Sequence, residues 1–175
     1  MARDHAVGAM NVLVVHAHPY PARSHAGGRL IEALAGLPDQ DLRSLYQLYP
    51  DFDVDAEAER RALERADLVV WSHPLYWHSM PALLKHWFDT VLVQGWAWGE
   101  TGTALAGKRA LLAVTAGKAS AEPLSAYVRL VESIARTCHM EWREPFVVDE
   151  AESIGDEQLR AAAARFRARI EEEGR

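Results

Sequence analysis

Short uncharged apolar runs alternate along the chain with longer segments in which apolar residues recur every three or four positions. A short apolar run is typical of a parallel strand buried on both faces, and a recurrence every three or four positions is typical of a helix that covers the sheet. The runs predict five strands, at residues 11–17, 41–50, 68–71, 109–115 and 142–149. The periodic segments predict five helices, starting near Ser24, within residues 51–66, near Ser79, at residue 122 and at residue 156.

This alternation indicates the fold class. Strands that alternate with helices are joined by right-handed crossovers and form a parallel sheet. We predict an α/β fold with a doubly wound parallel sheet and helices on both faces. Residues 11–175 contain no repeat, low-complexity segment or linker and should form a single domain. Residues 1–10 are polar and aperiodic and should form a disordered or frayed tail.

Composition excludes several classes of protein. With 49% apolar and 25% charged residues the chain resembles a soluble globular protein, and its net charge of -6 argues against a sequence-independent nucleic-acid binder. Cys138 is the only cysteine, so an internal disulfide and a cysteine-based metal site are both excluded. No run approaches the roughly 20 apolar residues of a membrane span, and the N-terminus lacks a signal-peptide core. We expect a cytoplasmic protein.

The loop after the first strand, "HPYPARSHAGG", carries groups suited to an anion. Ser24 can donate a hydroxyl hydrogen bond, His18 and His25 can donate ring N–H groups, and Gly27 and Gly28 let the backbone approach a ligand. Next to a helix N-terminus, these groups predict a phosphate site. In the alternative interpretation Ser24 is an ordinary N-cap and the histidines are solvated. Neither a dinucleotide fingerprint nor a P-loop motif is present.

Two further loops end at the same edge of the predicted sheet. After the third strand, "PLYWH" (74–78) offers aromatic side chains and a proline-fixed backbone, a combination suited to a flat heteroaromatic ligand with Trp77 as the packing surface. Alternatively, Tyr76 and Trp77 are core or interface aromatics. After the fourth strand, "TAGK" (115–118) faces this edge too, unless it is an ordinary connection between strand and helix.

The predicted helix near residues 81–92 has a wide apolar arc. Its members are Leu83, Leu84, Trp87, Phe88, Val91 and Leu92. This arc is wider than one face of a sheet requires, so part of it is expected to form a dimer interface.

A metal site and a catalytic nucleophile are also considered. Four histidines fall at the ends of neighbouring strands: His16, His18, His73 and His78. The residues after "HAHP" are Tyr20 and Pro21, where a hydrolytic metal site needs carboxylates, so metal catalysis is not favoured. His16 is expected to be a core histidine. No serine stands in a G-x-S-x-G elbow, and Cys138 lies late in a helix.

Four motifs occur in an order that resembles a known family: "VVHAHPYPARSHA", "SLYQLYPDFDVDAE", "ADLVVWSHPLYWHSMPALLKHWFDTVL" and "GWAWGETGTALAGKRALLAVTAG". They resemble the flavodoxin-like NAD(P)H:quinone oxidoreductases, and most closely the ancillary subunits of glutathione-gated potassium efflux antiporters. The resemblance covers residues 11–117, with a trace at Glu144-Pro145-Phe146. It implies a flavodoxin-like, five-stranded sheet in the order 2-1-3-4-5.

The resemblance also implies a non-covalent FMN, or FAD, at the edge of the sheet. His18 and residues 24–27 would hold its phosphate, residues 75–78 would line the isoalloxazine, and residues 115–118 would close over its pyrimidine edge. The candidate cofactor-binding residues are His18, Ser24, His25, Ala26, Gly27, Pro74, Leu75, Tyr76, Trp77, His78, Thr115, Ala116, Gly117 and Lys118. NAD(P)H would deliver hydride to the flavin and leave, and a quinone would then accept two electrons. Family members are homodimers, and the antiporter-associated branch docks on a membrane transporter from the cytoplasmic side.

One departure from the family concerns Lys118, which stands where a glycine is usual. A side chain there can block the loop conformation, or place a cation near the pyrimidine edge. The segment that follows is also shorter than in the family, so no catalytic residue is assigned, and Tyr127 is expected in a helix core. The alternative function is therefore a regulatory antiporter subunit with reduced or absent oxidoreductase activity. The choice between NADH and NADPH, and the identity of the acceptor, stay open.

Overall fold

Parallel strands form the centre of the molecule. The computed structural model describes residues 10–117 and 121–174, without the side chains of residues 121–123. The strands are β1 (Val12–His16), β2 (Gln40–Ser44), β3 (Leu68–Pro74), β4 (Arg109–Thr115), β5 (Glu141–Trp142) and β6 (Phe146–Val148). All pairings are parallel, and the order β2-β1-β3-β4-β5, with β6 also paired to β4, confirms the predicted order.

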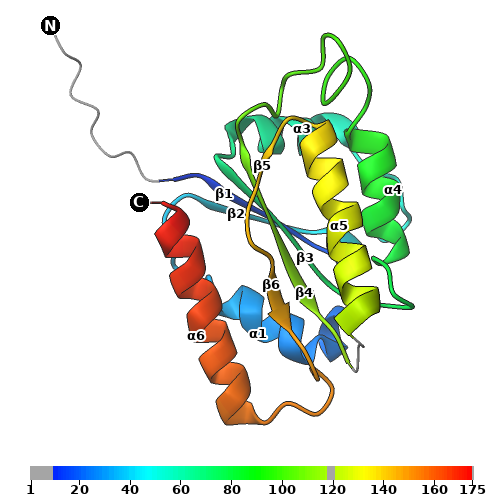
Figure 1. Cartoon of the computed structure of the whole chain (residues 1–175). Coiled ribbons are helices and arrows are strands. Elements are labelled where there is room, and N and C mark those ends of the chain that lie inside the picture. The colour runs from blue at the N-terminus through cyan, green and yellow to red at the C-terminus, as the bar shows by residue number, and fades with distance from the viewer. Residues whose placement is uncertain (1–9, 118–120, 175) are drawn as a thin grey trace, which may run out of the picture.

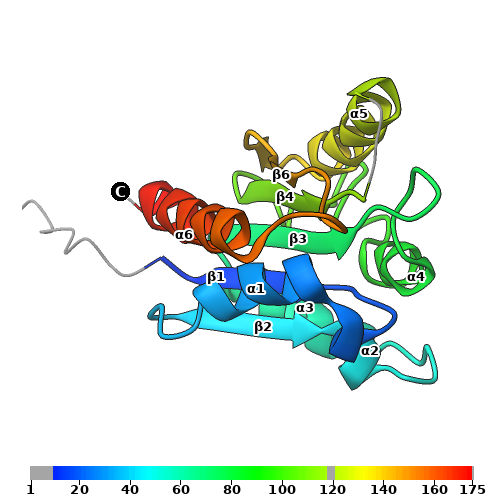
Figure 2. The same cartoon turned by 90° about the horizontal axis from the view of Figure 1, so that it is seen from below.

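Helices cover both faces of this sheet (Figures 1 and 2). They are α1 (His25–Ala33), α2 (Leu45–Leu48), α3 (Ala56–Arg65), α4 (Ala82–Val91), α5 (Ala121–Thr137) and α6 (Asp156–Glu173), and a 3-10 turn, η1, spans Pro21–Arg23. α1 and α6 lie side by side on one face, and α3, α4 and α5 cover the other. Among the residues that the structure describes, no helix is both long and apolar enough to span a bilayer.

Successive residues of the central strands point to opposite faces and so build two cores. In β3, Leu68 and Val70 pack beneath α1 and α6, whereas Val69 and Trp71 pack beneath the three helices of the other face. This double burial explains why β3 reads as an unbroken apolar run in the sequence.

The predicted second strand is too long. β2 ends at Ser44, and the next four residues form α2 instead of continuing to residue 50. Among the described strands β2 lies at the edge of the sheet and pairs with β1, and this pairing ends at His16↔Ser44. A helical turn brings Leu45 and Tyr49, four residues apart, onto one buried side, and Tyr49 N–H donates to the Leu45 carbonyl over 2.8 Å.

The predicted fifth strand is divided in two. Trp142 pairs with Ala110 and Phe146 pairs with Ala113, so three residues on one strand face two on β4. This extra residue forms a bulge, and Pro145 within it has no N–H to donate to the sheet.

The apolar arc of α4 does not form the exposed surface from which a dimer interface was expected. Leu83, Leu84, Trp87, Phe88 and Val91 are buried within the chain, beneath α3 and beside β3 and α5. Phe88 packs edge-to-face on Trp71, with 5.1 Å between ring centroids. The width of the arc therefore results from contacts on several sides of α4 within one chain.

Candidate functional site

The carboxyl ends of β1, β3 and β4 meet around a cleft of about 460 Å³. This size lies within the range of small-molecule sites, and the position is where open α/β sheets bind ligands. Residues of all three predicted loops line the cleft: His18, His25, Ala26, Gly27, Pro74, Leu75, Tyr76, Thr115 and Gly117. Arg23, Ala151 and Glu152 complete the wall.

His18 is a hydrogen-bond donor in the wall of this cleft. Its Nδ1 atom accepts a hydrogen bond from the Tyr20 backbone N–H over 3.1 Å, so the neutral ring carries its proton on Nε2. The side chain is buried, and burial lowers the pKa of the imidazole. At neutral pH His18 therefore offers an N–H group without a full charge, and an anion placed beside it would raise its pKa.

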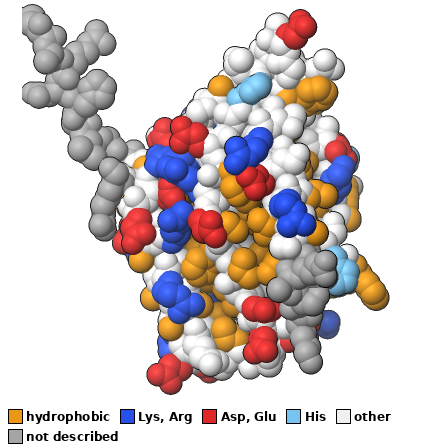
Figure 3. All heavy atoms as spheres, in the orientation of Figure 1, with side chains coloured by type: hydrophobic (Ala, Val, Ile, Leu, Met, Phe, Trp, Pro, Cys, Tyr) orange, Lys and Arg blue, Asp and Glu red, His pale blue; other side chains and the backbone are white. Residues whose placement is uncertain are grey.

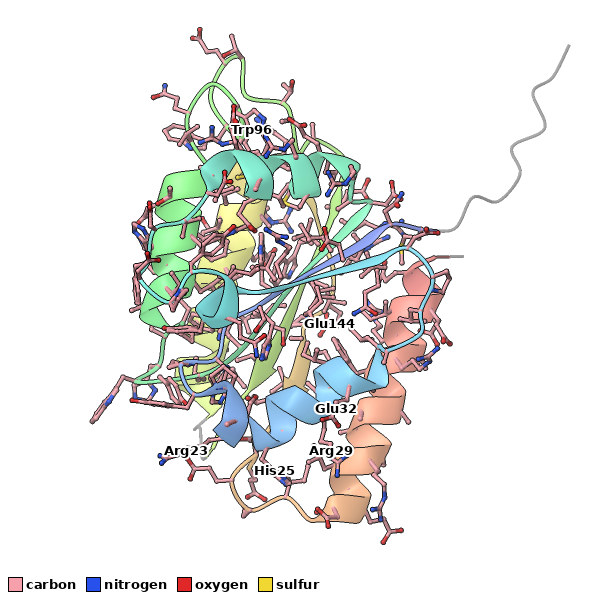
Figure 4. The ribbon with its side chains drawn as sticks, turned by 180° about the vertical axis from the view of Figure 1, so that it is seen from behind. Arg23, His25, Arg29, Glu32, Trp96 and Glu144 are labelled. Atoms are coloured by element: carbon pink, nitrogen blue, oxygen red, sulfur yellow. The ribbon has the colours of Figure 1, made fainter. Side chains whose placement is uncertain are left out.

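Arg23 brings positive charge to the cleft wall, which His25 lines as well. Arg23 comes from η1, His25 is the first residue of α1, and Figure 4 shows both at the N-terminal end of that helix. Arg23 lies over the Tyr20 ring, 5.8 Å from its centroid. A cation and the unpaired amides of a helix start favour a bound anion. Arg29 and Glu32, farther along α1, pair with each other instead.

Ser24 does not act as the ordinary N-cap of the alternative interpretation. Its side chain makes no capping hydrogen bond, and its buried hydroxyl has no partner among the described residues. A Cβ added to Gly27 would meet this hydroxyl at 2.9 Å, so Gly27 allows the helix start to approach it. Ser24 itself does not line the cleft, but its hydroxyl lies beside Gly27, which does.

The second loop contributes fewer side chains than its sequence suggests. Tyr76 and Ser79 exchange two backbone hydrogen bonds of 2.9 Å, which close a tight turn with Trp77 and His78 at its tip. Both tip residues have positive φ, 48° and 60°, and Trp77 is 96% exposed. Leu75 and Tyr76 therefore line the cleft, whereas Trp77 and His78 do not.

The third loop is held to the segment after β6. Ala116 N–H donates to the Val148 carbonyl, and the Ala116 carbonyl accepts from Ala151 N–H. The Ala116 side chain is buried and does not line the cleft, whereas Thr115 and Gly117 do. Lys118 lies outside the described residues, so the role suggested for it stays a prediction.

Three cleft residues were not anticipated from the sequence: Arg23, Ala151 and Glu152. Arg23 lies within the first loop and could have been selected as its only cation. Glu152 belongs to an acidic stretch that follows the last strand at the same edge of the sheet. The sequence indicated that this segment lies at the same edge of the sheet as the cleft, but it does not indicate which of its side chains turn toward the cleft.

A buried histidine lies behind the second loop. His73 Nδ1 donates to the Pro74 carbonyl over 2.9 Å, and Tyr127 OH donates to His73 Nε2 over 2.8 Å. Burial lowers the pKa of His73 to about 4, so both bonds involve the neutral ring. Tyr127 thus lies in the core, and its hydroxyl helps to orient the peptide that opens the cleft loop.

The histidines at the strand ends do not form a metal-binding group. His16 is buried, with its Nδ1 3.2 Å from Ser72 Oγ, while His73 bonds Tyr127 and the exposed His78 lies at the turn tip. In the described part of the chain, no group of three or more histidine, cysteine or acidic residues is arranged to hold a metal ion.

A doubly wound parallel sheet with a cleft at the carboxyl ends of β1 and β3, lined by the loop after β1, is typical of a flavodoxin-like protein. The chain belongs to the flavodoxin-like fold family, whose model matches residues 10–170.

Particular relatives are closely similar. The glutathione-regulated potassium-efflux system ancillary protein KefF of Klebsiella aerogenes is 43% identical over 166 residues, which cover 91% of this chain and 94% of that protein. General stress protein 14 from Treponema denticola, solved in complex with FMN, superposes with a TM-score of 0.86 at 30% identity, covering 93% of this chain and 98% of that one. An NADPH-quinone reductase from P. pentosaceus superposes with a TM-score of 0.81 at 27% identity, covering 91% of this chain and 97% of that one.

Proposed function

We propose that this protein is an FMN-dependent NAD(P)H:quinone oxidoreductase of the cytoplasm. The observation that carries the proposal is a cleft lined both by hydrogen-bond donors at the start of α1 and by the aromatic and apolar side chains of Leu75 and Tyr76. The solved FMN complex and the quinone reductase among its structural relatives support the same function.

The described residues fit this cofactor. The unpartnered Ser24 hydroxyl, the His18 Nε2–H group and the Arg23 guanidinium would hold the phosphate, since each donates hydrogen bonds to oxygen. Leu75 and Tyr76 would cover the ring and exclude water from it. When bound, flavin supplies the capacity to take up a hydride from a nicotinamide and pass two electrons to an acceptor.

An absorption and fluorescence titration tests the proposal. We expect flavin bands in the purified protein, or after FMN is added and the excess removed, and oxidation of NAD(P)H only when a quinone is present. Riboflavin, which lacks the phosphate, should bind at least tenfold more weakly than FMN, because it leaves the donors of the first loop unpaired. Protein that neither retains nor binds FMN would contradict the proposal.

We propose in addition that the protein forms a homodimer. One face of the molecule carries hydrophobic side chains between charged ones in the region of β5 and β6, an edge of the sheet (Figure 3). Phe146 and Val147 of β6 are only partly buried there, and Leu130 of α5 is 53% exposed. Sedimentation equilibrium should give twice the 19.5 kDa mass of one chain, and a monomer at micromolar concentration would refute the dimer.

The similarity to KefF favours a second role, as the ancillary subunit of a potassium efflux antiporter, docked at the inner face of the membrane. Potassium efflux should fall when the gene is deleted and return when it is restored. Complementation with a variant that cannot bind FMN would show whether this role needs the cofactor. Efflux that is unchanged by the deletion would remove the second role and leave the first intact.

A further inference from the structure

Glu152 lies in the cleft wall, on a segment that no sequence motif covers. Its position is held from both sides, because Ala151 N–H donates to the Ala116 carbonyl over 2.8 Å and Ile154 N–H closes a turn onto the Glu150 carbonyl over 3.0 Å. Both bonds tie this segment into an ordered turn after β6. The carboxylate is therefore presented at the end of β4 by the backbone.

The carboxylate lies directly against Gly117. A Cβ added to Gly117 would stand 2.7 Å from Glu152 Oε1 and 2.8 Å from its Cδ, so any larger residue would displace the acid. Gly117 is not among the glycines with positive φ. A glycine at this position therefore leaves room for the carboxylate to come close, and is not required by an unusual backbone conformation.

The cleft wall contains one acidic residue among those described, Glu152, and it also contains His18, Arg23 and His25. No lysine, arginine or histidine of the described chain forms an ion pair with Glu152. Burial, together with Tyr20 and Glu152, raises the pKa of the Tyr76 phenol, which places the acid within electrostatic reach of the aromatic wall. Glu152 thus brings a carboxylate, without an ion-pair partner among the described residues, to the part of the cleft wall formed by Tyr76 and Gly117.

We propose that Glu152 sets the reduction potential of the flavin by opposing the negative charge that the ring gains on reduction, an inference that rests on the proposed function. Uptake of two electrons and one proton leaves the isoalloxazine with one more negative charge than the oxidised form. Glu152 lies in the cleft wall with Tyr76 and against Gly117, so its carboxylate would stabilise the oxidised form of a ring covered by Tyr76 relative to the reduced form. The electrons come from NAD(P)H and leave to the quinone, and a lower potential favours the second transfer.

Two substitutions at this position test the effect of charge by itself. Glu152→Gln keeps the shape and removes one negative charge, and Glu152→Lys reverses the charge. The matched control is Glu150→Gln, which removes the same charge from an exposed residue of the same segment that does not line the cleft. For each FMN-loaded protein, the affinity for oxidised FMN is measured by fluorescence, and the midpoint potential by reduction against a reference dye.

We expect the preference for reduced over oxidised flavin to rise about tenfold in Glu152→Gln and about a hundredfold in Glu152→Lys. For a two-electron couple these changes raise the potential by about 30 and about 60 mV. The control should match the wild type.

Equal potentials in all four proteins would overturn the inference and leave the proposed function standing. So would a Glu152→Gln protein that loses affinity for both redox forms equally, because the acid would then be only a contact. A wild-type protein without affinity for FMN would instead refute the proposed function, and the inference with it.

Discussion

Ser24 shows how a single residue can appear to serve the fold while its geometry suits a ligand. A serine immediately before a helix normally caps it, and its loss then costs about 1 kcal/mol. Here the side chain caps nothing, and its hydroxyl is buried without a partner in the described structure. An unsatisfied buried hydroxyl destabilises the protein until something accepts its hydrogen bond.

Ser24→Ala should therefore change folding and binding in opposite directions. Removal of the unpaired hydroxyl should leave the free energy of unfolding unchanged or raise it by up to ~1 kcal/mol, whereas FMN affinity should fall about tenfold. Urea unfolding of the apoprotein and an FMN titration measure the two effects. Ser153→Ala, whose hydroxyl bonds the Glu150 carbonyl away from the cleft, is the control. A loss of stability with unchanged affinity would show that Ser24 serves the helix.

At the scale of elements, one buried carboxylate joins β2, the C-cap of α2, α3 and α4. Glu59 of α3 is fully buried and accepts hydrogen bonds from the Arg43 guanidinium, from Tyr49 OH at 2.6 Å and from Trp87 Nε1 at 2.9 Å. Burial, followed by the bond to Glu59, raises the pKa of Tyr49 to about 12, so the phenol stays a donor. These four side chains fix the short helix that replaces the end of the predicted second strand.

Glu59→Ala should lower the free energy of unfolding by roughly 3–5 kcal/mol, because it leaves a cation and two buried donors without their acceptor. Glu57→Ala, two residues earlier in the same helix, removes an exposed partner of Arg61 and should cost less than ~1 kcal/mol. Chemical denaturation of both variants provides the comparison. Equal and small losses would mean that packing alone holds these four elements together.

At the scale of the whole molecule, two neutral histidines at the ends of the central strands link folding to pH. Burial lowers the pKa of His16 to about 4, with the charges of His18 and His73 adding to the effect, and burial alone does the same for His73. Both rings titrate near pH 6.5 in the unfolded chain. Between these values the unfolded state binds more protons than the folded state, so their contribution to stability is complete above pH 6.5 and is lost as the pH falls toward 4.

We expect the free energy of unfolding to fall by on the order of 2 kcal/mol for each histidine between pH 7 and pH 5. Urea denaturation at the two pH values measures the change. In His73→Gln the difference between the two pH values should be about half as large, whereas His86→Gln, an exposed histidine, should retain it in full. A wild-type protein that is equally stable at both pH values would show that these rings are protonated in the folded state.

The sequence by itself determined the central strands and the edge of the sheet at which the cleft lies. Apolar runs identified β1, β3 and β4, because strands buried on both faces need apolar side chains at every position. Their carboxyl ends then had to meet at one edge, which placed His18, Tyr76 and Gly117 around a common cleft. These features follow from local patterns and from the handedness of the connections.

Only the tertiary structure decided which side chains face inward. It turned Trp77 out to solvent, buried Glu59, and left the Ser24 hydroxyl without a partner among the described residues. It also brought Arg23 and Glu152, 129 positions apart in the chain, into one cleft. Such outcomes depend on contacts between segments that are distant in sequence, so they cannot be predicted from a residue's neighbours along the chain. The charge pattern of the cleft, and with it the tuning proposed for the cofactor, is therefore a property of the folded molecule.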